Sequence, residues 1–227
     1  TSETAILRMR KLLGDDDSFR REGLGIWDAE NSISAIDPQQ WEAGNIEQPD
    51  LDGRLAFGLD MPPDRSALAV GMAVRHDDGT ALINLQEYRD AKQSGTAWAV
   101  DWLAERWHKT SAVVIDAQSP AMSLLPDLQK RHIKVIVTQS RDLGAATGRV
   151  LDMIHAGTLQ HLDAEHQPQL SMAAHGVTLR DIGPNGLKAW NKKGSDIDIS
   201  PLQACTVALH GAFVSKRKPG RKQRVMV

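Results

Sequence analysis

Cysteine is nearly absent from this sequence of 227 residues, which contains only Cys205. A single cysteine cannot form an internal disulfide, and it cannot supply the cysteine pairs of a structural zinc site. Cys205 lies among alanine, valine and leucine residues, so we expect it in an apolar core rather than as a nucleophile. The sequence therefore excludes a disulfide framework and favours a reducing, intracellular setting.

Long apolar runs and several well-known motifs are also missing. No window reaches the roughly 18 consecutive apolar residues that a membrane-spanning helix needs, and no charged-then-apolar leader opens the sequence. The patterns GxxxxGK[ST], GxGxxG, GxSxG and HExxH do not occur. We therefore expect neither a membrane protein nor a secreted one, and no ATP site in this chain.

What is present is typical of a globular protein, with 41% hydrophobic and 25% charged residues. The net charge of −2 is unevenly distributed along the chain. Residues 1–53 carry 12 acids and 5 bases, whereas residues 216–227 carry six bases and no acid. This distribution predicts an acidic N-terminal connector segment (1–53), a main domain (54–214) and a basic C-terminal tail (215–227).

The main domain begins with apolar runs that are separated by turn residues. They predict three successive antiparallel strands over 54–60, 66–74 and 79–88. Helix-period and short apolar segments then alternate: a helix containing Trp98 and Trp102, a strand over 112–116, a helix from Ser119, a strand over 133–137 and a helix over 140–155. This order, β-β-β-α-β-α-β-α, predicts an α/β fold with one mixed sheet flanked by helices.

The last third of the main domain has less regular signals. We expect a helix over 168–180, then a β-hairpin over 181–194 with its turn at Pro184–Gly186. A final helix is expected to have Ser200 as its N-cap and to end near Gly211.

Three aspartates follow predicted strands or precede a predicted helix, at positions that could meet at one edge of the sheet. Asp60 ends the first predicted strand, Asp116 ends the fourth, and Asp198 directly precedes the last helix. Each one alone is also typical of a turn or helix cap, and Asp196 could replace Asp198. Converging carboxylates would repel one another without a cation, and oxygen ligands of this kind suit Mg²⁺ or Mn²⁺. The pattern therefore favours a two-metal phosphodiesterase site with these acids as ligands.

The basic residues allow two interpretations. Lys188, Lys192 and Lys193 precede Asp198 and could guide a phosphate backbone toward the acids, or they could be ordinary exposed lysines. The tail, with Lys216, Arg217 and Lys218, could bind nucleic acid or be only a solvated end.

The aromatic and histidine residues give weaker signals. Trp98, Trp102 and Trp107 have the spacing of core residues on a helix, whereas Trp190 is the better candidate for stacking on a base. Three histidines fall close together, but their spacing does not favour a zinc site; these are His155, His161 and His166.

The order of strands, helices and aspartates resembles that of the ribonuclease H-like nucleases. Four segments, FRREGLGIW, FGLDMPPDRS, VVIDAQSPAMSLLPDL and DIDISPLQACTVALHG, resemble more narrowly the C-terminal nuclease part of the large terminase subunit of tailed bacteriophages, particularly those of actinobacterial hosts. The resemblance covers about residues 19–211. It implies a ribonuclease H-like sheet and a metal-dependent DNA endonuclease that cuts concatemeric viral DNA during packaging in the host cytoplasm.

The resemblance also implies partners and roles for residues. The metal-binding, catalytic acids would be Asp60, Asp116 and Asp198, holding two Mg²⁺ or Mn²⁺ ions. The partners would be double-stranded DNA, the portal, the small terminase subunit and a packaging ATPase domain of the same polypeptide, whose phosphate loop this chain lacks. Two alternatives are a transposase or resolvase-like nuclease of the same fold and a non-catalytic docking module of the packaging motor.

Overall fold

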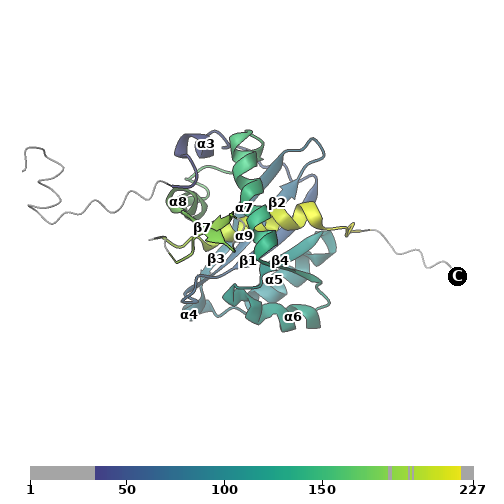
Figure 1. Cartoon of the computed structure of the whole chain (residues 1–227). Coiled ribbons are helices and arrows are strands. Elements are labelled where there is room, and N and C mark those ends of the chain that lie inside the picture. Colours follow the sequence, from purple (N-terminus) through teal and green to yellow (C-terminus); the bar gives the residue numbers. More distant parts are fainter. Residues whose placement is uncertain (1–33, 184–185, 194, 196, 221–227) are drawn as a thin grey trace, which may run out of the picture. The chain divides into compact units, whose positions relative to one another are not determined.

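The computed structural model describes residues 34–183, 186–193, 195 and 197–220, which carry the architecture shown in Figure 1. Most of the predicted connector, the tail beyond Gly220, Asp196 and part of the predicted hairpin turn lie outside the described residues. Among the described residues, no helix combines the length and the apolar character that crossing a membrane requires.

A six-stranded mixed sheet forms the centre of the fold, in the order β5-β4-β1-β2-β3-β6. The strands β1, β2 and β3 are antiparallel neighbours, whereas β1–β4, β4–β5 and β3–β6 are parallel pairs. This arrangement confirms the predicted α/β mixed sheet. The strand bounds are β1 Arg54–Asp60, β2 Ala67–Arg75, β3 Ala81–Asp90, β4 Ala112–Asp116, β5 Val135–Thr138 and β6 Leu159–Gln160.

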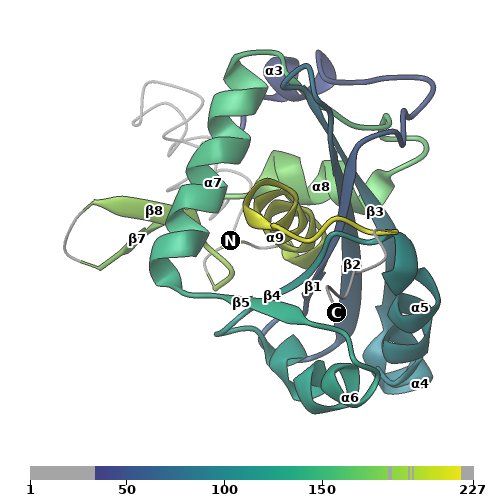
Figure 2. The same cartoon turned by 90° about the vertical axis from the view of Figure 1, so that its right-hand side faces the viewer.

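Helices cover both faces of the sheet, as parallel connections require (Figure 2). One face packs against α7, α8 and α9, and the other packs against α5, η3 and α6. Each face has its own apolar core, because alternate strand residues point to opposite sides of the sheet. The bounds are α4 Ala91–Ser94, α5 Trp98–Arg106, η2 Trp107–Lys109, η3 Pro120–Leu124, α6 Leu125–Lys130, α7 Ser140–His155, α8 Pro168–Gly176 and α9 Ser200–Val214.

Helix α9 lies unusually close to the centre of the sheet. A Cβ on Gly58 of β1 would come within 2.1 Å of the Ala204 carbonyl oxygen, and one on Gly71 of β2 would come within 2.3 Å of the Cys205 nitrogen. Both glycines are therefore required for this approach. The contact buries nearly the whole length of α9 and holds its first residue, Ser200, near the end of β1.

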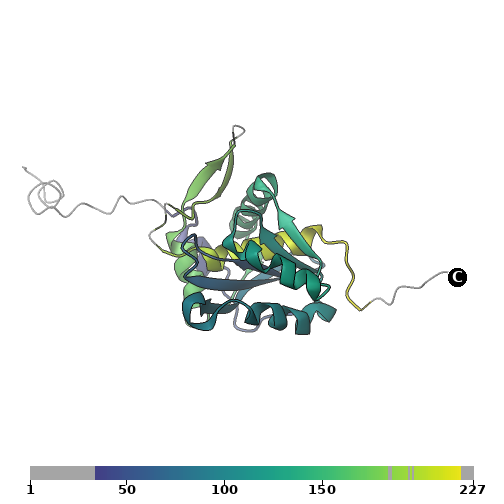
Figure 3. The ribbon, with the colours of Figure 1, turned by 90° about the horizontal axis from the view of Figure 1, so that it is seen from below.

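The hairpin differs from its prediction mainly at its start. The helix predicted over 168–180 ends at Gly176, and β7 Leu179–Ile182 pairs with β8 Leu187–Trp190. The hairpin extends away from the main sheet (Figure 3) and packs against α7. Gly144 of α7 makes room for it, since a Cβ there would lie 3.3 Å from Leu187.

Part of the predicted connector packs onto the main domain. Helix α3 (Pro38–Glu42) is capped by Asp37, and both Ile36 and Trp41 are buried in the core on the α9 face. The Trp41 ring stacks on His161 with a centroid distance of 3.8 Å. Residues 34–46 therefore share a core with residues of the predicted nuclease domain.

Candidate functional site

Asp60 and Asp116 lie side by side at the carboxyl ends of adjacent parallel strands. The register pairs Leu59 of β1 with Ile115 of β4, which places the next residue of each strand at the same edge. Both strands are buried and apolar up to this point, so the sheet core fixes the position of the two carboxylates. The structure thus brings two of the three predicted acids together.

Asp60 is a completely buried acid that has, among the described residues, one ion-pair partner. Its Oδ1 lies 2.5 Å from Nζ of Lys192, whose side chain is 19% exposed. Burial raises the pKa of Asp60 to about 6, and the nearby lysine charge offsets part of that increase. Its Oδ2 has no hydrogen-bond partner within the described part of the chain. A buried carboxylate oxygen without a partner is costly, which suits a site that binds a cation.

Asp116 is buried less deeply and, among the described residues, forms no ion pair. Burial raises its pKa, and the charges of Lys192 and Arg180 lower it by smaller amounts. Its Oδ1 accepts a long hydrogen bond of 3.4 Å from the Gln118 backbone N–H. Asp116 therefore retains acceptor capacity toward the cavity that it lines.

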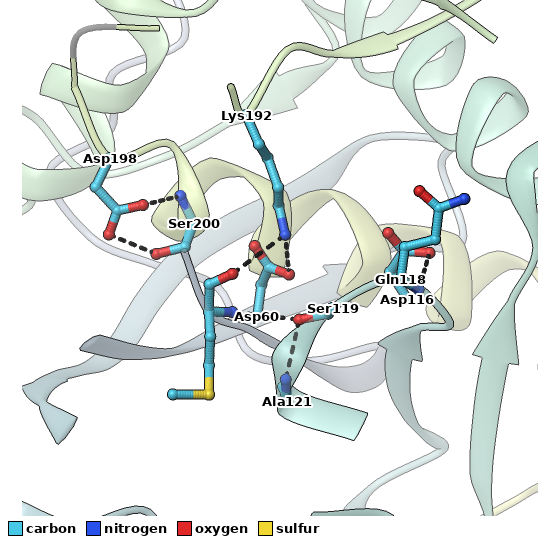
Figure 4. Close-up of polar contacts among 9 residues, drawn as sticks. Asp60, Asp116, Gln118, Ser119, Ala121, Lys192, Asp198 and Ser200 are labelled. Carbon is cyan, nitrogen blue, oxygen red and sulfur yellow. Dashed lines mark hydrogen bonds and ion pairs between the residues drawn. The ribbon is translucent and has the colours of Figure 1, made fainter. Parts of the chain in front are cut away.

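Asp198 lies on the other side of Lys192 and is turned toward the start of α9 (Figure 4). Its Oδ1 accepts a hydrogen bond of 2.8 Å from the Ser200 N–H, and its Oδ2 accepts from the Ser200 and Tyr88 hydroxyls at 2.8 and 2.9 Å. In the described residues, no group of three His, Cys, Asp or Glu side chains is arranged to hold a metal ion. Asp198 thus acts here as a helix-start acceptor beside the acid pair.

The basic residues predicted near the acids have different environments. Lys192 donates to Asp60 and also to the Met61 carbonyl oxygen, at 3.3 Å. Lys188 pairs with Asp181 on the surface of the hairpin. Lys193 is exposed and lines the cavity beside Asp116. Of these three, only Lys193 is free of a partner among the described residues, so the hairpin lysines are not equivalent.

The predicted tail begins with residues that are packed against the body. Arg217 donates to the Trp107 and Thr110 carbonyl oxygens, and its guanidinium lies 3.9 Å from the centre of the Trp107 ring. The Ser215 hydroxyl donates to the Ser111 carbonyl oxygen at 2.6 Å. Lys216 and Lys218 are exposed. Arg217 therefore anchors the chain after α9 and is not a free basic side chain.

The tryptophans show one error in the sequence interpretation. Trp190 is 1% exposed and donates from Nε1 to the Thr206 hydroxyl, so it is a core residue and not a platform for a base. Its neighbours in the sequence, Lys192 and Lys193, suggested a surface position, whereas β8 packs on α7 and the ring reaches Thr206 of α9 in the core.

Arg180 and Gln203 are among the polar residues lining the cavity that sequence reasoning missed. Arg180 was expected at the end of a helix but lies in β7, and Gln203 lies inside an otherwise apolar helix. A glutamine within the apolar segment ISPLQACTVAL was the one signal available.

No protein-family model matches the sequence, and no curated protein matches it significantly. Solved structures do resemble the fold. The large terminase of bacteriophage HK97 is 16% identical, with a TM-score of 0.60, over 92% of this chain and 50% of that one. The large terminase nuclease of thermophilic phage G20c is 10% identical, with a TM-score of 0.53, over 74% and 94%. The nuclease domain of the large terminase subunit of bacterial virus Sf6 is 12% identical, with a TM-score of 0.55, over 78% and 99%.

These likenesses show that the chain shares the fold of phage large terminase nucleases. The chain spans about half the length of the HK97 large terminase, and 74% of it aligns with nearly all of the G20c nuclease.

Proposed function

We propose that this chain is the nuclease domain of a phage large terminase and that it cuts double-stranded DNA with the help of divalent metal ions. The observation that carries the proposal is the placement of Asp60 beside Asp116 at the ends of two adjacent parallel strands, in this fold. Asp60 presents a buried oxygen without a partner among the described residues, and Asp116 faces a cavity.

The donor set fits Mg²⁺ or Mn²⁺, because both ions prefer carboxylate oxygens. Nuclease structures of the same fold, from phages G20c and Sf6, contain magnesium and manganese respectively. Bound at Asp60 and Asp116, two such ions would activate water and stabilise the leaving oxygen of the phosphodiester. Asp198 is the third acid proposed for this set, since it lies across Lys192 from Asp60.

In the proposed cleavage, the residues of this chain position the metal-binding carboxylates and supply positive charge. The apolar strands β1 and β4 hold Asp60 and Asp116 rigidly, which is what catalysis by positioned carboxylates requires. Lys192 provides the positive charge that Asp60 needs in the absence of metal. Lys188, Lys193, Lys216 and Lys218 are the proposed contacts to DNA phosphates, and Arg217 would contribute only charge from its anchored position.

The proposed partners follow from the same assignment. The domain would work with a packaging ATPase domain of the same polypeptide, with the portal and with the small terminase subunit, and it would act on concatemeric viral DNA in the host cytoplasm.

The experiment is a cleavage time course on plasmid DNA with Mg²⁺, with Mn²⁺ and with a chelator. We expect cutting that requires a divalent ion and falls at least about a hundredfold in Asp60→Ala and Asp116→Ala. The matched control is Asp152→Ala, which removes an acid of α7 outside the site. Normal cutting by both site variants would refute the site.

Substrate choice separates the proposal from its alternatives. Strand joining, or preference for a four-way junction over linear and supercoiled DNA, would indicate a transposase or resolvase. Absence of both metal binding by calorimetry and cutting with any divalent ion would indicate a docking module.

A further inference from the structure

The cavity beside Asp116 contains polar groups that the proposed metal site does not use. Its volume is about 440 Å³, and Asp116, Lys192, Arg180, Lys193 and Gln203 are among the residues that line it. Asp116 and Lys192 belong to the acid site. The other three come from β7, from the segment after β8 and from α9, so distant parts of the sequence meet here.

Arg180 and Lys193 are cations without an anionic partner among the described residues. Within the described part of the chain, neither side chain forms an ion pair or a hydrogen bond, although Arg180 is close enough to lower the pKa of Asp116. By contrast, Lys188 on the same hairpin is paired with Asp181. Two unpaired cations on one cavity wall favour an anionic ligand.

Gln203 supplies an independent observation on the inner wall. It is 1% exposed on α9, and its Nε2 has no hydrogen-bond acceptor in the described residues. An amide without a partner in an apolar helix destabilises the fold compared with a satisfied one. A ligand that accepts a hydrogen bond from this amide would remove that cost.

We propose that this cavity binds a DNA backbone phosphate adjacent to the one that is cut. Arg180 and Lys193 are the charged donors, and the Gln203 amide is the inner donor. The inference rests on the proposed function, because Asp60 and Asp116 define where the cut phosphate lies. A phosphodiester suits these donors, since its two unbridged oxygens accept bidentate hydrogen bonds from a guanidinium.

Such a subsite would position the DNA strand for cleavage. The packing of β8 on α7 fixes the hairpin that carries Arg180, so the bound phosphate would be held at a constant offset from the acid pair. Arg180 and Gln203 are therefore expected to affect the rate of cutting as well as affinity.

The first test measures DNA binding in chelator, without any cleavage. Fluorescence anisotropy with a short duplex over a salt series should show that Arg180→Gln weakens binding and reduces the slope of log affinity against log salt by about one unit. The matched control is Lys134→Gln, which removes one charge just before β5, at the opposite end of that strand from Thr138, the partner of Asp116. Its slope should remain that of the unmodified chain.

The second test measures cleavage in Mn²⁺ and the integrity of the fold. Gln203→Leu should lower kcat at least about tenfold while its melting temperature stays level or rises, because the change removes an unpartnered buried amide. Gln203→Glu should lose more, since it places a negative charge against the phosphate. Gln129→Leu, an exposed position on α6, is the control for the substitution.

The outcomes separate the two hypotheses. If Arg180→Gln and Gln203→Leu both bind and cut DNA like the unmodified chain, with the same salt slope and kcat, the subsite is overturned. The proposed nuclease function is then unaffected. If the unmodified chain cuts no DNA with any ion, the proposed function fails, and the salt slope of Arg180→Gln in chelator decides the subsite alone.

Discussion

At the residue scale, the site is dominated by one buried acid and one lysine. Asp60 has no exposed surface, and Lys192 is the cation that accompanies it in the absence of metal. Burying both charges costs desolvation energy that their attraction must recover. A metal ion that binds Asp60 would compete with Lys192 for the same carboxylate, so the lysine sets the balance between the metal-free and metal-bound site.

This competition gives a prediction for Lys192→Met. In chelator at pH 8 the variant should melt several degrees lower, because a buried carboxylate loses its partner. At pH 5 the loss should be smaller, since the pKa of Asp60 is about 6 and the acid is then mostly neutral. Added Mn²⁺ should raise the melting temperature more than in the unmodified chain. The control is Lys193→Met, whose side chain is exposed; equal melting of the two variants would contradict the argument.

Asp198 gives a second prediction at this scale. Asp198→Ala should lower the free energy of unfolding by about 1 kcal/mol, because Ser200 at the start of α9 loses its acceptor. Asp198→Asn keeps an acceptor oxygen and should lose less. If Asp198 is the third metal ligand, both variants should lose cutting at least about a hundredfold. Urea unfolding and cleavage time courses check both expectations, and normal cutting by Asp198→Asn would remove Asp198 from the ligand set.

At the element scale, the short helix α3 places Trp41 against a buried histidine of the body. His161 stacks on Trp41, and its two ring nitrogens lie 2.8 Å from the Leu162 carbonyl oxygen and 3.0 Å from that of Trp41. A neutral imidazole can donate to only one of them. Burial nevertheless lowers the pKa of His161, so the neutral form prevails in the folded chain.

A pH dependence follows from that lowered pKa. The unfolded chain takes up a proton at His161 near pH 6.5, where the folded chain resists it, so the free energy of unfolding should fall as the pH drops below about 6.5. Urea unfolding at pH 7.5 and 5.5 should show this fall. In His161→Phe, which keeps a ring against Trp41, the fall should be smaller. An identical fall in the variant would assign the acid sensitivity to other groups.

At the scale of the whole molecule, Asp198 and the described basic residues Lys216 and Lys218 lie at opposite ends of α9. The helix has 15 residues and is therefore about 22 Å long, with Asp198 before its start and Ser215 after its end. Ser215 and Arg217 are part of the packed body. A DNA contact made by Lys216 or Lys218 would thus lie at the end of α9 that is remote from Asp198.

Deletion of residues 219–227 tests the tail without removing these anchors. The deletion removes the three bases Arg221, Lys222 and Arg224. We expect weaker DNA binding at low salt, with the salt slope reduced by about one unit for each lost phosphate contact, and an unchanged melting temperature. Arg217→Gln is the contrasting variant, which should lower the melting temperature because its carbonyl contacts are lost. An unchanged salt slope after deletion would show that these residues do not bind DNA.

Much of the fold was predictable because its elements carry local signals. The apolar runs that end in Asp60 and Asp116 match β1 and β4, and the helix expected over 140–155 is α7, with the same bounds. Hydrophobic period and turn residues act over a few positions, so the sequence determined the order of elements. Chain direction then sufficed to predict that Asp60 and Asp116 share an edge, because parallel neighbouring strands end together.

Only the tertiary structure decided which polar groups meet. The pairing of Lys192 with Asp60 joins positions 132 residues apart, and the cavity unites Arg180, Gln203 and Asp116. The same folding buried Trp190, anchored Arg217 and directed Asp198 toward Ser200. Such contacts depend on how α9 and the hairpin pack across the sheet. That packing is set by the close approach that glycines allow and by the total apolar surface that becomes buried. Neither of these two causes leaves a periodic pattern in the sequence. The sequence therefore determined the elements and the acid pair, whereas tertiary packing determined the partners of those acids.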